Sequence, residues 1–97
     1  MYKCYNIKIS GKIQNIGFRT LIENLAIMLN LKGYVFNDID DTVKIVCCGE
    51  NGIILDFMNE IRVRAEQRGV EIENIKSDEI TGTLFLPEKF IRLFSTP

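Results

Sequence analysis

The fold of this chain is decided by the stretch SGKIQNIGFR, which runs from Ser10 to Arg19. It follows an alternating apolar run and precedes an amphipathic one, so it predicts a turn from a strand into a helix. Such a turn can direct several backbone N–H groups at one point, where the positive end of the helix dipole favours an anion. Arg19 can add a two-pronged, charge-assisted hydrogen bond. The alternative interpretation is an ordinary tight turn with a solvated arginine.

Hydrophobic periodicity extends this prediction on both sides of the turn. Apolar and polar residues alternate from Tyr5 to Ser10, which indicates a strand with one buried face. Apolar residues then recur at helical spacing from Phe18 to Leu31, and Gly33 is expected in the C-cap region of that helix. The same spacing predicts a second helix from Ile53 to Gln67.

The remaining segments complete an α+β pattern. Strands are predicted at 33–37, 43–48 and 70–73, with a short last strand within 90–94 at an edge. The order βαββαβ plus a tail predicts one ferredoxin-like domain over residues 1–97, a sandwich of an antiparallel-dominated sheet with two helices on one face. The first and second strands should be parallel, with the third between them. Asn37 and the 14–19 loop would then lie at one edge, about 10 Å apart.

Composition narrows the classes of function. The chain has 97 residues, and 46% of them are apolar. Its formal net charge is −1, and this lack of positive charge argues against a general nucleic-acid binder. Cys4, Cys47 and Cys48 show neither disulfide nor metal spacing, so we expect buried thiols in a reducing, cytoplasmic environment. No signal peptide or membrane-spanning run is recognised. Because histidine is absent, the chemistry must work without an imidazole base.

Three motifs resemble the acylphosphatase family. Gly11–Arg19 is similar to its G-x-V-Q-G-V-x-F-R signature, GYVFN at 33–37 to G-[WY]-V-x-N, and DDTV at 40–43 to D-G-x-V. The matches come in the family's order and cover roughly residues 5–65, whereas the C-terminal third matches only in outline. The resemblance implies the ferredoxin-like fold and hydrolysis of the carboxyl–phosphate bond of an acyl phosphate.

The resemblance also implies roles for individual residues. Arg19 and Asn37 would be catalytic, with the Asn37 amide orienting the attacking water and Arg19 stabilising phosphoryl charge. The phosphate-binding residues would be Gln14, Asn15, Ile16, Gly17, Phe18 and Arg19. No metal and no cofactor are implied. The expected partner is a small acyl phosphate, or a phosphate or sulfate anion, and we expect a monomer that binds neither nucleic acid nor membrane.

Some of these residues also have plainer interpretations. Gln14 is expected to brace the loop through a side-chain hydrogen bond, and Phe18 to pack in the core. Asn15 and Asp41 stand where the family has glycine, and Asp38, Asp40 and Asp41 crowd one turn, where they are expected to be solvated but could repel an anion.

These departures keep a second function open, a catalytically weak or inactive anion- or protein-binding domain on the same scaffold. An RNA-binding module ranks last, because the strand at 43–48 has no aromatic residue.

Overall fold

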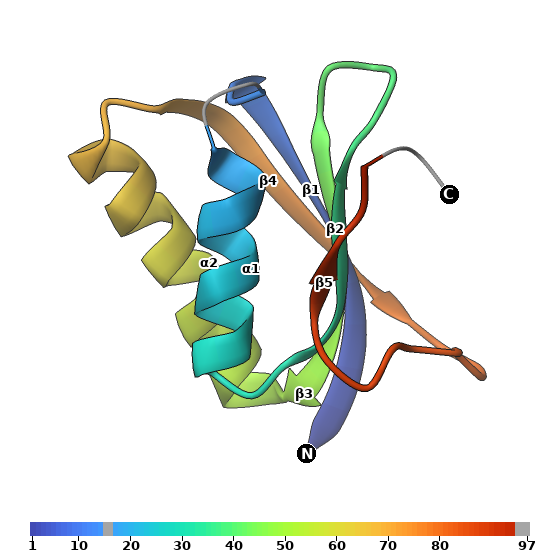
Figure 1. The fold of residues 1–97 in the computed structure, drawn as a ribbon. Coiled ribbons are helices and arrows are strands. Elements are labelled where there is room, and N and C mark those ends of the chain that lie inside the picture. The colour runs from blue at the N-terminus through green and yellow to red at the C-terminus, as the bar shows by residue number, and fades with distance from the viewer. Residues whose placement is uncertain (15–16, 95–97) are drawn as a thin grey trace.

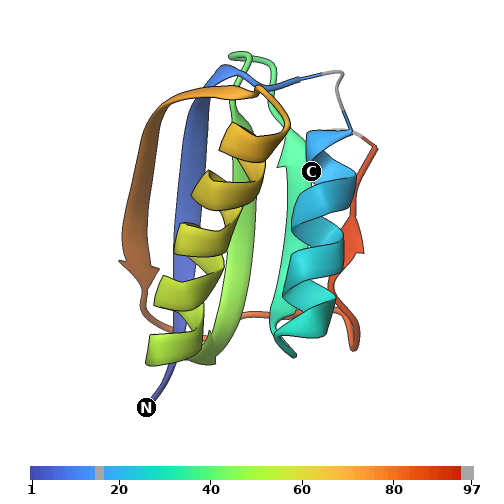
Figure 2. The same ribbon diagram turned by 90° about the vertical axis from the view of Figure 1, so that its left-hand side faces the viewer.

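The structure is a computed structural model, which describes residues 1–14 and 17–94. It has a five-stranded sheet with two helices packed on one face, as Figures 1 and 2 show. The elements are β1 (Tyr2–Lys12), α1 (Phe18–Met28), β2 (Lys32–Asn37), β3 (Val43–Glu50), α2 (Asn51–Gln67), β4 (Glu71–Ile80) and β5 (Ile91–Arg92). No described helix is both long and apolar enough to cross a bilayer.

The strand order is β4-β1-β3-β2-β5, which confirms the predicted ferredoxin-like fold with a short C-terminal edge strand. Strand β3 is antiparallel to both β1 and β2, and β5 is parallel to β2. It follows that β1, β2 and β5 all run in the same direction. Their carboxyl ends therefore lie at one end of the sheet.

The core lies between the sheet and the helices. Period-two alternation sends Ile7 and Ile9 of β1 towards the helices, where each is at most 1% exposed. Ile22 of α1 and Phe57 of α2 meet them with no exposed surface. Burying a side chain of this size stabilises the fold by roughly 1.5–3 kcal/mol, so the helices are held mainly by this layer.

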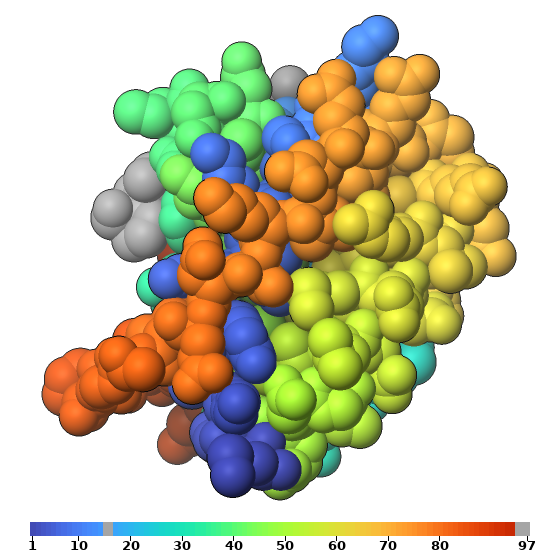
Figure 3. All heavy atoms as spheres, turned by 180° about the vertical axis from the view of Figure 1, so that it is seen from behind, coloured from blue at the N-terminus to red at the C-terminus, as the bar shows by residue number. Residues whose placement is uncertain are grey.

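An aromatic residue anchors the chain just before the C-terminal strand. The chain after β4 crosses to the opposite edge of the sheet before it forms β5 (Figure 2), and part of it projects from the body of the molecule in Figure 3. Phe85 in this segment is 96% exposed, but Phe90 is only 2% exposed. The Phe90 ring packs edge-on against Phe57, with centroids 6.4 Å apart. This contact and the pairing of β5 with β2 place β5 at the edge of the sheet.

Helix α1 ends earlier than its periodicity predicts, at Met28 instead of Leu31. Asn30 takes a left-handed φ of 61°, and the amides of Asn30 and Leu31 donate back to the last helical turn at 3.1 and 2.9 Å. This is a Schellman end in which asparagine replaces the usual glycine. The prediction that Gly33 caps the helix is therefore wrong.

Gly33 has a different role, inside β2. A Cβ at this position would lie 1.8 Å from the carbonyl oxygen of Val46 in the neighbouring β3. Only glycine permits so close an approach of the two backbones.

Other boundaries shift by a few residues because strand pairing extends beyond the alternating segments. Helix α2 begins at Asn51, two residues before the predicted start at Ile53. Strand β4 reaches Ile80 because it pairs with β1 almost throughout. Strand β5 occupies two residues of the predicted 90–94 segment.

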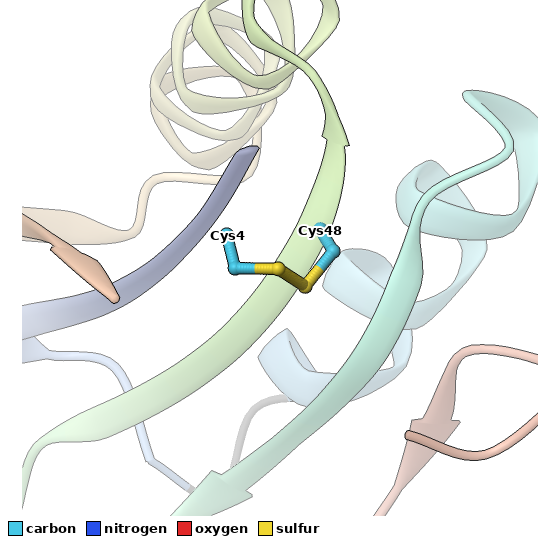
Figure 4. Close-up of a disulfide and its surroundings, with 2 residues drawn as sticks. All are labelled: Cys4 and Cys48. Carbon is cyan, nitrogen blue, oxygen red and sulfur yellow. A yellow bond between two sulfur atoms is a disulfide. The ribbon is translucent and has the colours of Figure 1, made fainter. Parts of the chain in front are cut away.

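Two of the three cysteines form a disulfide, which corrects the expectation of free thiols. Cys4 and Cys48 lie directly opposite each other across β1 and β3, with Cα atoms 4.0 Å apart, and are bonded through sulfur (Figure 4). A count of cysteines could not reveal this pairing, because the register of the two strands creates it. Cys47 points to the core face, where burial raises the pKa of its thiol to about 12 and makes it a poor nucleophile.

The disulfide should contribute measurably to stability, since it closes a loop between residues 44 positions apart. The double variant Cys4→Ala/Cys48→Ala is expected to lose about 2–4 kcal/mol of unfolding free energy in urea. Adding a thiol reductant should lower the unfolding free energy of the wild type to about that of the double variant. It should not change the unfolding free energy of the double variant. Equal stability of the wild type with and without reductant would contradict the cross-link.

Candidate active site

Three segments far apart in sequence meet at the carboxyl ends of β1, β2 and β5. They are the start of α1, the turn between β2 and β3, and the chain that leaves β5, all near the top of Figures 1 and 2. The parallel direction of the three strands produces this meeting. The sequence prediction that Asn37 and the loop before Arg19 share one edge agrees with this arrangement.

The loop enters α1 through a left-handed residue. Ile13, the residue that follows β1, is 1% exposed. Gly17 is the N-cap residue, with φ 74° and ψ 16°, a conformation that glycine adopts without strain. Phe18 begins the helix and is buried in the core, as the sequence predicts. Asn15 and Ile16, two of the predicted phosphate-binding residues, lie outside the described part of the chain.

Gln14 ties this loop to the neighbouring turn. Its side-chain nitrogen donates to the backbone carbonyls of Asp38 and Thr42, at 3.2 and 3.0 Å. These carbonyls flank the β2–β3 turn, immediately after Asn37. The bracing predicted for Gln14 is therefore present, and it sets the spacing between the loop and the end of β2.

The β2–β3 turn is internally hydrogen-bonded. The amide of Asp38 donates to the Thr42 carbonyl at 2.8 Å, and the amide and hydroxyl of Thr42 donate to Oδ1 of Asp40. Those bonds to Thr42, with a further contribution from Lys44, lower the pKa of Asp40 to about 2. Asp41 has φ 65°, the left-handed conformation that favours glycine and that aspartate tolerates.

Lysines balance the charge of this turn. Lys44 contacts Asp38 and lies 3.4 Å from Oδ2 of Asp40, while Lys8 lies 3.8 Å from the same oxygen. Asp40 is exposed, as expected, but it also forms hydrogen bonds and ion pairs. The expectation of a solvated side chain is wrong for Asp38, whose side chain is only 12% exposed and pairs with Lys44. Their repulsion of an anion is correspondingly reduced.

Arg19 is positioned by the C-terminal segment. Its Nη1 donates to the carbonyl oxygen of Leu93 at 2.6 Å, a contact between residues 74 positions apart. A guanidinium has five N–H donors, so this bond fixes the side chain and leaves most of its donors for other partners.

Arg19 and Asn37 line one small pocket of about 40 Å³. Its other lining residues are Ile13, Gly17, Phe18, Thr20 and Arg92. Both side chains predicted to be catalytic therefore face a common space at the N-terminus of α1. No carboxylate is among the described lining residues, and two of them are arginines, so the electrostatics favour an anion.

A larger cavity, of about 560 Å³, lies between α2 and β4. Glu66, Glu71 and Glu73 line it together with Arg62. This excess of carboxylates would repel a phosphorylated ligand, so size alone does not identify the site. Within residues 1–14 and 17–94, no group of three or more His, Cys, Asp or Glu side chains could hold a metal ion.

Ile13, Thr20 and Arg92 line the pocket but were not predicted from the sequence, and Arg92 is the charged residue among them. It lies on β5, in the part of the chain where periodicity is weakest, and reaches the site only because β5 pairs with β2. The signal that could have found it is a single cation within the apolar run from Phe90 to Phe94.

Comparison with known proteins identifies the family. The family model named Acylphosphatase matches residues 5–90. The chain therefore belongs to the acylphosphatase family, in agreement with the motifs at the start of α1 and the end of β2.

Relatives match along most of this chain. An acylphosphatase from Clostridium acetobutylicum is 36% identical over 80 residues, covering 82% of this chain and 86% of that protein. An acylphosphatase-like protein from Methanocaldococcus jannaschii is 30% identical over 97 residues, but the chain spans only 63% of its length. An acylphosphatase structure from Coxiella burnetii superposes with a TM-score of 0.81 at 26% identity, covering 95% and 93% of the two chains.

The Gln14 bridge yields a stability prediction. Gln14→Leu keeps the approximate size of the side chain but removes both hydrogen bonds to the turn. We expect a loss of about 1–3 kcal/mol of unfolding free energy in urea, because two partly buried hydrogen bonds of about 0.5–1.5 kcal/mol each are removed. The two carbonyls keep their backbone donors, the amides of Asp41 and Asp38. Gln67→Leu, at the exposed end of α2, is the matched control and should change stability little. Equal stability of the two variants would show that the bridge is unimportant.

Proposed function

We propose that this protein is an acylphosphatase that hydrolyses the carboxyl–phosphate bond of a small acyl phosphate. The observation that carries the proposal is the shared pocket of Arg19 and Asn37, which come from different elements and converge at a helix N-terminus. Family membership supports the same reaction.

In the proposed mechanism, the phosphoryl group lies at the start of α1. The backbone amides of Gly17, Phe18 and Arg19 and the Arg19 guanidinium bind its oxygens, and Gln14 holds the loop in place. The amides of Asn15 and Ile16, beyond the described residues, complete the predicted set. These donors stabilise the charge of the transition state without moving during the reaction.

Water is the proposed nucleophile, and the Asn37 amide orients it. The water oxygen forms a bond to phosphorus while the bond from phosphorus to the acyl oxygen breaks. The leaving carboxylate keeps the electron pair of that bond, and a proton of the water passes to a phosphoryl oxygen. The products are one carboxylate and one inorganic phosphate. An amide side chain is no base near neutral pH, so its contribution is orientation.

The tether between Arg19 and Leu93 fits this mechanism. A guanidinium already fixed by a 2.6 Å hydrogen bond loses little side-chain entropy when a phosphoryl group binds. Preorganised donors of this kind lower the activation barrier more than mobile ones.

Arg19→Ala should reduce kcat/KM for benzoyl phosphate by about 10²–10³, the effect of losing one preorganised donor. The matched control is Arg62→Ala, an exposed arginine of α2 that lies outside the pocket and should retain activity. The measurement is the initial rate of benzoyl phosphate hydrolysis, followed by absorbance. Full activity of Arg19→Ala would refute the assignment. Saturable binding of inorganic phosphate without turnover would instead favour the anion-binding alternative.

A further inference from the structure

The Arg92 side chain makes contacts that the pairing of β5 does not require. Arg92 is one of only two residues in β5, and its Nη1 donates to the hydroxyl of Thr20 on α1. Its guanidinium carbon also lies 5.9 Å from the ring centre of Phe94. The side chain is half-buried and lines the same pocket as Arg19 and Asn37. Two contacts thus hold a cation at the wall of the proposed active site.

Placing two guanidinium groups in one small pocket costs free energy unless a negative charge neutralises them. Like charges repel, and partial burial weakens the hydration of each. Neither Arg19 nor Arg92 forms an ion pair with a carboxylate in the described part of the chain. An anionic ligand in the pocket would supply the negative charge that the described residues do not.

We propose that Arg92 is a second phosphoryl-binding residue, which shares the phosphoryl group with Arg19. This inference rests on the proposed function, because the ligand it names is the phosphoryl group of the acyl phosphate. Near neutral pH that group carries close to two negative charges, which two guanidinium groups balance. Arg19 and Arg92 line the same small pocket, so both would contact the same ligand.

The two arginines have different supports, and this predicts different kinetic effects. Arg19 follows the N-cap of α1 and is tethered to Leu93, whereas Arg92 approaches from β5 and is tethered to Thr20. We assign Arg92 to binding of the phosphoryl charge in substrate and product alike. Its loss should then raise KM and weaken phosphate binding, with a smaller effect on kcat.

The experiment compares Arg92→Gln, Arg92→Lys and Arg62→Gln with the wild type. The dissociation constant of inorganic phosphate is measured by calorimetry. The values of kcat and KM are measured from initial rates of benzoyl phosphate hydrolysis. Arg92→Gln should weaken phosphate binding and raise KM by about 10-fold or more, while kcat changes less than about threefold. Arg92→Lys should recover part of the affinity because the charge returns, and Arg62→Gln should match the wild type.

A structural role for Arg92 gives a different pattern. If Arg92 only attaches β5 to α1, then Thr20→Val should weaken phosphate binding as much as Arg92→Gln, and Arg92→Lys should restore nothing. That outcome would overturn the proposal, as would unchanged phosphate affinity in Arg92→Gln. Urea unfolding of each variant checks that it is folded. If Arg92→Gln does not fold, the phosphate affinity and KM of Arg92→Lys still test the proposal.

The two proposals can fail separately. If the wild type binds phosphate through Arg92 but hydrolyses no acyl phosphate, the proposed function fails and this assignment stands. If it hydrolyses acyl phosphates and Arg92→Gln has wild-type KM and phosphate affinity, only the assignment of Arg92 fails. Absence of any phosphate binding by the folded wild type would overturn the role of Arg92.

Discussion

The position of β3 between β1 and β2 is the constraint on which the site depends. Because β3 is antiparallel to both neighbours, β1 and β2 point the same way, and the parallel pairing of β5 with β2 adds a third strand in that direction. Three chain segments therefore leave the sheet at one end. A loop, a turn and a C-terminal segment meet there without any long insertion, and each supplies part of one pocket.

The site also depends on how charge is distributed around that pocket. The molecule carries a formal net charge of −1, yet the described pocket residues include two arginines and no carboxylate. In the acidic turn beside Asn37, Asp38 and Asp40 form ion pairs with Lys8 and Lys44. Glutamates line the larger cavity between α2 and β4. A phosphorylated ligand is thus favoured at the start of α1 over that cavity.

The fold could be predicted from the sequence because its elements have clear periodicity and glycine-containing boundaries. The hairpin and both helices follow from local patterns, and so does the edge shared by Arg19 and Asn37. The resemblance between GYVFN and the family motif drew attention to Asn37. Where asparagine or aspartate replaces glycine, as at Asn30 and Asp41, the backbone is still left-handed, with φ of 61° and 65°.

The features that could not be predicted all depend on contacts between distant residues. The disulfide arises from the register that places Cys4 opposite Cys48, and no spacing in the sequence encodes it. The tether from Arg19 to Leu93 joins residues 74 apart, and Arg92 enters the pocket through a strand of two residues. Such a short strand has too little periodicity to recognise, and Phe90 positions it through a contact with the distant α2.

The most direct test of the pocket is a titration of ¹⁵N-labelled protein with inorganic phosphate, followed by NMR. Binding at the start of α1 should shift the amide signals of Gly17, Phe18 and Arg19 and the Nε signals of both pocket arginines, all with one dissociation constant. The signals of Glu66 and Ile72, in the α2–β4 cavity, should not move. Absence of saturable shifts at the start of α1, or larger shifts in the α2–β4 cavity, would contradict a phosphate site there.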